Sequence, residues 1–126
     1  MSFDVSVDRR SQGVCVVTLG GRLDTAASAQ CEAALAATFL DPPRILVFDL
    51  ARLTFIGSLG LRILFRARKI VEGRGGVVAV TNPQPAIVKV FQVVAALPAE
   101  RVFASVNEAD AYLAQFQEWR PGDGGS

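Results

Sequence analysis

The sequence of 126 residues contains no histidine, and it has only one methionine, one tryptophan and one tyrosine. Without histidine, a Ser-His-Asp triad, a Cys-His dyad and any histidine-ligated metal site are excluded. The two cysteines, Cys15 and Cys31, are too few for a disulfide framework. Cys15 lies in a strand-like apolar run and Cys31 in an Ala-rich helix, which predicts buried thiols rather than a redox pair. We therefore expect no catalytic residues, no metal and no cofactor.

An excess of charge of one sign is also missing, because 13 basic residues stand against 12 acidic ones. This balance gives no reason to expect direct nucleic-acid binding. The chain has no run of 18 apolar residues, so no membrane insertion is expected. Residues 1–7 lack a basic stretch followed by an apolar one, so no signal peptide is expected either. These features together predict a cytoplasmic protein.

What the chain does contain is an alternation of apolar strand-like runs and helix-like runs, typical of an α/β fold. Strands are expected at five places: Phe3–Val7, Val14–Leu19, Ile45–Leu50, Val77–Thr81 and Val102–Ala104. Helices are expected at four: Ala26–Phe39, Gly60–Glu72, Ala86–Ala95 and Glu108–Trp119. The pattern predicts a mostly parallel, mixed five-stranded sheet with an initial antiparallel hairpin and about four helices. We expect one domain over residues 1–119 and a flexible tail over 120–126.

The second expected helix has faces of different character. An apolar stripe at helical spacing should rest on the sheet: Gly60, Ile63, Leu64, Ala67 and Val71. Arg62, Arg66 and Lys69 share another face, with Leu59 one turn before Arg62, and Leu61 and Phe65 flank the core stripe. Between residues 44 and 74, seven basic residues stand against two acidic ones. A basic face bordered by apolar groups suits an acidic protein partner, although the cations can also simply solvate the helix.

The segment that joins the third strand to this helix carries a recognisable motif. It reads Phe-Ile-Gly-Ser-Leu-Gly-Leu over residues 55–61. This resembles the signature of the STAS family (sulphate transporter and anti-sigma factor antagonist), Phe-Ile-Asp-Ser-Ser-Gly-Leu. Residues 19–24, Leu-Gly-Gly-Arg-Leu-Asp, are similar to the family's Leu-x-Gly-x-Leu-Asp before its first helix. The resemblance covers essentially the whole chain.

The motif departs from the family pattern at two positions. Gly57 stands where the family has Asp, and Ser58 keeps the first Ser. Leu59 occupies the position that is phosphorylated in many members, which implies that the usual phosphate switch is lost. Two interpretations of Ser58 stay open: it caps the helix, or it serves as the phosphoacceptor in place of its neighbour.

The resemblance implies a non-enzymatic protein-binding regulator, similar to an anti-sigma factor antagonist. The implied partner is an anti-sigma factor of the GHKL serine-kinase type, which would itself hold nucleotide and Mg²⁺. We expect the contact to use the loop after the third strand and the second helix, namely Gly57, Ser58, Leu59, Leu61, Arg62, Phe65 and Arg66. The alternative is a small STAS subunit of an ABC-type membrane transport assembly that docks on the ATPase. A homodimer and a small-ligand sensor also remain possible.

Overall fold

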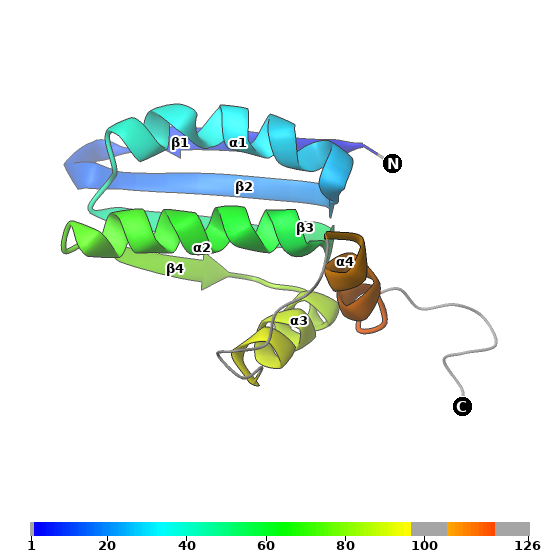
Figure 1. Ribbon diagram of the computed structural model, residues 1–126. Helices are drawn as coiled ribbons and strands as arrows, with labels where there is room; N and C mark the ends of the chain where they lie inside the picture. The colour runs from blue at the N-terminus through cyan, green and yellow to red at the C-terminus, as the bar shows by residue number, and fades with distance from the viewer. Residues whose placement is uncertain (1, 97–105, 118–126) are drawn as a thin grey trace.

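The computed structural model describes residues 2–96 and 106–117 (Figure 1). Its strands form one sheet in the order β1-β2-β3-β4. Their bounds are β1 (Phe3–Arg9), β2 (Val14–Leu23), β3 (Ile45–Ile56) and β4 (Val77–Thr81), with a short 3-10 turn, η1 (Ser11–Gly13), between the first two. β1 pairs with β2 antiparallel, whereas β2 with β3 and β3 with β4 are parallel. The expected mixed sheet with an initial hairpin is confirmed.

The expected number of strands is wrong for the sheet that the structure describes, which has four strands instead of five. The residues expected to form the fifth, 102–104, lie outside the described part of the chain, as do residues 118–126 with the expected tail and Trp119.

Four helices accompany the sheet: α1 (Thr25–Leu40), α2 (Ser58–Gly73), α3 (Pro85–Ala96) and α4 (Val106–Ala114). α1 and α2 lie side by side on one face of the sheet, and α4 lies at the end of the sheet where both of them begin (Figure 1). Asp24 caps α1, since the Ala27 N–H donates to its carboxylate at 3.0 Å. No described helix combines the length and apolar character that a membrane crossing requires.

The apolar stripe expected on α2 is buried, and Leu61 is buried with it. Gly60 permits this packing, because a Cβ there would lie 2.7 Å from Cγ of Leu23 and 3.0 Å from Cγ1 of Ile56. The first turn of α2 therefore sits directly on the ends of β2 and β3. This close approach fixes the position of residues 57–59, which precede Gly60, relative to the sheet.

β3 extends six residues beyond the expected strand, to Ile56. The β2–β3 register shifts twice, between Thr18 and Gly20 and between Gly21 and Arg22, so that β3 gains a residue at each shift. The Asp49 carboxylate accepts from the Ala51 N–H at 3.1 Å near the first of these irregularities. Bulges interrupt the alternation of side chains between the two faces. The sequence pattern beyond Leu50 therefore resembles a loop although it pairs as a strand.

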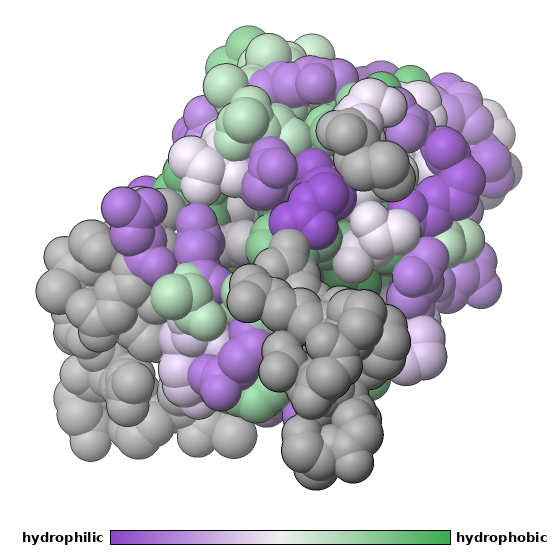
Figure 2. Space-filling model, turned by 90° about the vertical axis from the view of Figure 1, so that its right-hand side faces the viewer, coloured by the Kyte–Doolittle hydropathy of each residue, from purple (hydrophilic) through white to green (hydrophobic). Residues whose placement is uncertain are grey.

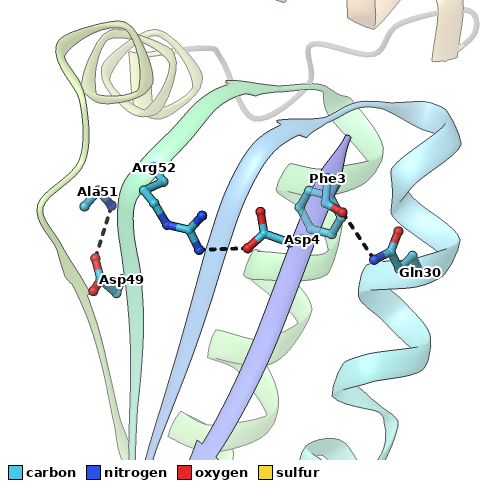
Figure 3. Close-up of polar contacts among 6 residues, drawn as sticks. All are labelled: Phe3, Asp4, Gln30, Asp49, Ala51 and Arg52. Carbon is cyan, nitrogen blue, oxygen red and sulfur yellow. Dashed lines mark hydrogen bonds and ion pairs between the residues drawn. The ribbon is translucent and has the colours of Figure 1, made fainter. Parts of the chain in front are cut away.

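Figure 3 shows polar contacts that tie the β1 edge to the rest of the fold. Arg52 on β3 reaches across β2 to Asp4 on β1, with 2.7 Å between Nη2 and Oδ2. Gly20 lies beneath this ion pair, since a Cβ there would come within 2.7 Å of the Asp4 carboxylate. On the helix side, the Gln30 side chain of α1 donates to the Phe3 carbonyl at 3.4 Å.

Candidate partner-binding surface

A single residue, Gly57, connects β3 to α2, and the backbone around it is held on all sides. The Gly57 N–H donates to the Leu23 carbonyl at 2.9 Å. The Ile56 N–H donates to Oε1 of Gln117 at 2.6 Å, and Nε2 of Gln117 returns a bond to the Ile56 carbonyl at 2.7 Å. The Ser58 N–H donates to Oδ1 of Asp110 at 2.8 Å. The loop is therefore fixed both by β2 and by the segment around α4.

Asp110 connects the starts of two helices to α4. Its Oδ1 accepts from the Ser58 hydroxyl at 2.9 Å as well as from the Ser58 N–H, and its Oδ2 accepts from Oγ1 of Thr25 at 3.1 Å. The interpretation of Ser58 as a helix cap is therefore wrong: Gly57 occupies the N-cap position, and Ser58 is the first residue of α2. Gly57 has no side chain to cap the helix, and Asp110 supplies from another helix an acceptor for the first N–H of α2, one of the groups that a helix start leaves without a partner.

The space around Gly57 disfavours an aspartate there. A Cβ at position 57 would lie 3.0 Å from Oδ1 of Asp110. A carboxylate at both positions would therefore bring two like charges together. Sequence reasoning missed Asp110 because its partner Ser58 lies 52 positions earlier. The one local signal was the missing acidic residue at Gly57.

The exposed part of α2 begins one turn after this loop. Phe65 is 46% exposed, and Leu59 is half-buried. Leu61, by contrast, is only 4% exposed and packs in the hydrophobic core. It was expected to flank the apolar stripe of α2, but it is part of the core. Gly57 is also buried. Among the residues expected at the interface, the exposed apolar area therefore comes mainly from Phe65.

Three cations accompany Phe65 on this helix. Arg62, Arg66 and Lys69 are exposed, and within residues 2–96 and 106–117 none of them forms an ion pair. The Arg66 guanidinium lies over the Phe39 ring of α1, 5.0 Å from its centroid. Arg68 differs from these three, because it pairs with Glu72 at 3.1 Å. The surface is thus apolar at Phe65 and cationic around it.

Two recesses open on either side of Phe65. One, of about 320 Å³, lies between α2, α3 and α4, and Arg62, Phe65, Val94 and Leu113 contribute to its lining. The other, of about 520 Å³, lies between α2, α3 and β4 and includes the Arg68–Glu72 pair. Figure 2 shows the end of the molecule where α4 lies: hydrophilic side chains dominate the centre of this face, and apolar ones gather at its upper edge, the height of α1 in Figure 1.

The two thiols lie away from this surface, in the core between α1 and the sheet. Burial raises the pKa of the Cys15 thiol, and burial followed by the neighbouring Glu32 carboxylate raises the pKa of Cys31 to about 11. Both thiols are therefore protonated at neutral pH and weakly nucleophilic. The described residues hold no group of three or more Cys, Asp or Glu side chains that could bind a metal ion.

This architecture, a mixed sheet with helices on one face and an exposed surface at the start of α2, is that of an α/β domain. The STAS domain family model matches residues 7–109. The chain belongs to the STAS domain family.

Comparison with known proteins finds bacterial relatives of one kind. BtrV of Bordetella bronchiseptica, named provisionally as an anti-sigma factor antagonist, is 30% identical over 109 residues, covering 86% of this chain and 91% of BtrV. The anti-sigma-F factor antagonist RsfB of Mycobacterium tuberculosis is 42% identical over 52 residues, covering 41% of this chain and 43% of RsfB. In that alignment the chain thus spans less than half of RsfB.

Solved structures show the same fold. The anti-sigma factor antagonist SpoIIAA in its unphosphorylated form superposes with a TM-score of 0.65 at 24% identity, over 73% of this chain and 81% of SpoIIAA. An anti-sigma factor antagonist from Mycobacterium paratuberculosis gives a TM-score of 0.58 at 26% identity, over 89% of this chain and 94% of that protein. The α/β fold of this chain is therefore SpoIIAA-like.

Proposed function

We propose that this chain is a non-enzymatic regulator, similar to an anti-sigma factor antagonist, which binds an anti-sigma factor through the loop after β3 and the first half of α2. The observation that carries the proposal is the exposed Phe65 ring beside Arg62 and Arg66, which form no ion pair among the described residues. An exposed aromatic ring adds little to the stability of an isolated domain, but it adds affinity when a partner buries it. The relatives are named as anti-sigma factor antagonists, which supports an anti-sigma factor as the partner.

The chemistry of the surface indicates what the partner presents. An apolar centre ringed by positive charge fits an apolar patch with acidic residues at its rim. The partner is proposed to be a serine kinase of the GHKL type that acts as an anti-sigma factor. Nucleotide and Mg²⁺ then belong to the partner. The chain itself contributes the contact residues Gly57, Ser58, Leu59, Leu61, Arg62, Phe65 and Arg66, with Gly57 and Leu61 shaping the surface from beneath.

Binding is proposed to proceed without the family's phosphorylation switch. Leu59 has no hydroxyl to accept a phosphoryl group. The Ser58 hydroxyl is engaged by Asp110 at 2.9 Å, and a phosphoryl group there would place a charge of about −1.5 to −2 against that carboxylate. The binding-competent form is therefore the unmodified protein, and control lies in the partner or in its abundance.

The test measures binding of the purified anti-sigma factors of the same genome to wild type, Phe65→Asp and Leu40→Asp. Leu40 is the matched control, because it is 87% exposed at the far end of α1. Phe65→Asp should weaken one complex by roughly tenfold to 100-fold, the range expected when one buried apolar side chain is lost. Leu40→Asp should bind like wild type. Equal effects of the two substitutions, or no binding by wild type, would contradict the proposal.

A further inference from the structure

The recess between α2, α3 and α4 lies next to Phe65 and is continuous with the proposed interface. Its floor and walls are apolar, with Leu61 and Phe65 from α2, Val94 from α3, and Ala109 and Leu113 from α4. Two polar groups reach it, Ser58 and Arg62. The Ser58 hydroxyl already donates its proton to Asp110, so among the described lining residues Arg62 is the side chain with free hydrogen-bond donors.

We propose that this recess is the subsite for one apolar side chain of the protein partner, and that Asp110 is the positioning residue that holds its α4 wall in place. The proposal rests on the proposed function and specifies how the partner is recognised. The occupant is an apolar side chain next to a carboxylate, because Arg62 stands at the rim without an ion pair among the described residues.

Two alternatives fit the recess less well. A small polar ligand normally requires several converging polar groups in its pocket, and among the described lining residues only Arg62 has free donors. The larger recess beyond Phe65 has charged groups, Arg68 and Glu72, but they already pair with each other at 3.1 Å. The smaller recess thus combines an apolar lining with an uncommitted cation, which favours a protein side chain with an acidic neighbour.

Asp110 and Gln117, just beyond the helix, connect the α4 wall to the rest of the fold by hydrogen bonds. The helix has nine residues, too few to be stable alone in water. Its Asp110 carboxylate joins Ser58 of α2 and Thr25 of α1, and Leu113 packs in the core. Removing the carboxylate leaves the Ser58 N–H without its acceptor and removes the hydrogen bond that joins the middle of α4 to Thr25 of α1. The recess then loses the wall that Ala109 and Leu113 form.

The first experiment tests the positioning role without any partner. Amide hydrogen exchange in residues 106–114 and 58–61 should accelerate at least tenfold in Asp110→Ala, while exchange in β2 stays unchanged. Asp110→Asn should restore slow exchange, because its amide can still accept from Ser58 and donate to Thr25. Asp41→Ala, at an exposed carboxylate beyond α1, is the control. Unchanged exchange in Asp110→Ala would overturn the positioning role.

The second experiment fills the recess and measures binding to the anti-sigma factor identified with wild type. Ala109→Leu projects extra volume into the recess, whereas Ala111→Leu makes the same change on the exposed side of α4. Ala109→Leu should weaken binding at least tenfold while amide exchange in α4 stays unchanged. Asp110→Ala should also weaken binding at least tenfold. Asp110→Asn and Ala111→Leu should bind like wild type.

The outcomes separate the two proposals. If Phe65→Asp weakens binding but Ala109→Leu does not, the subsite is overturned and the proposed function stands. If Ala109→Leu and Ala111→Leu have equal effects, the subsite is likewise overturned. If wild type binds no anti-sigma factor, the proposed function and the subsite fail together, while the exchange experiment still decides the role of Asp110.

Discussion

The Ser58 hydroxyl and N–H both donate to one carboxylate oxygen of Asp110, at 2.9 Å and 2.8 Å. This contact joins the first residue of α2 to α4, 52 positions later in the chain. It stands directly beside Gly57, where the STAS signature has an aspartate of its own. In this chain the acidic group at the start of α2 therefore comes from a neighbouring helix, and the consequences can be measured.

Restoring the signature aspartate should destabilise this protein. In Gly57→Asp, the new Cβ lies 3.0 Å from Oδ1 of Asp110, so two carboxylates compete for the same space. We expect the free energy of unfolding to fall by about 1–3 kcal/mol, the range typical of a disrupted polar network. Urea unfolding followed by circular dichroism measures it.

The companion measurement makes the same substitution in an Asp110→Ala background. There the new aspartate can cap α2 itself, which is worth roughly a few tenths of a kcal/mol relative to glycine. Gly57→Asp should then be neutral or stabilising, so the double-mutant cycle should give a coupling of about 1 kcal/mol or more. Additive effects would show that the two positions do not share one role.

Charge added to Ser58 should loosen the start of α2. Ser58→Glu places a second carboxylate next to Asp110 and should lower the free energy of unfolding by about 1–3 kcal/mol. Ser58→Ala loses one hydrogen bond and should cost about 1 kcal/mol. Intact-mass analysis of the native protein should show no phosphate. A phosphopeptide that contains Ser58 would mean that the switch has moved by one residue.

Electrostatic attraction to the partner should depend on Arg62. Reversal to Arg62→Glu should lower the association rate constant several-fold at low ionic strength, and the difference should shrink as salt screens the charges. Lys89→Glu makes the same change on the exposed side of α3 and should have little effect. Stopped-flow measurements over a salt series give the dependence of the association rate constant on ionic strength for each variant. Equal slopes for the two variants would assign the attraction to net charge alone.

Alkaline pH should destabilise the fold through its buried thiols. The pKa of Cys31 rises from 9.0 to about 11 on burial, so the unfolded chain loses this proton first as pH increases. The contribution of Cys31 to stability is complete below pH 9 and is lost as pH rises toward 11, by roughly 2 kcal/mol. Cys31→Ala should show a correspondingly shallower decline in urea unfolding between these pH values. If the stability of Cys31→Ala declines as steeply as that of wild type, the loss of stability at alkaline pH comes from other groups.

Most of the fold could be predicted from the sequence, because hydrophobic periodicity marks each described element. The stripe from Gly60 to Val71 is buried as its spacing predicts, and Asp24 caps α1. The second half of β3, beyond Leu50, was not predicted, because its bulges break the alternation of apolar and polar residues by which a strand is recognised. The expected five strands also exceed the four that the structure describes.

The surface was harder to predict, because it depends on contacts between distant segments. Helical spacing placed Arg62 and Phe65 correctly near the edge of the core, but it could not decide that Leu61 is buried while Phe65 is 46% exposed. The role of Ser58 depends on Asp110, and no local pattern connects two residues so far apart. Chemistry carried by side chains from different helices becomes visible only when the packing is known.

The central claim is that the loop after β3 and the first half of α2 form the surface that an anti-sigma factor covers. The most direct test is amide hydrogen exchange of the protein alone and in complex with the anti-sigma factor that wild type binds. The account predicts that binding slows exchange in residues 57–66 and in α4, and leaves the outer strand β1 unchanged. Protection confined to β1 or to the far end of α1, with none in residues 57–66, would contradict it.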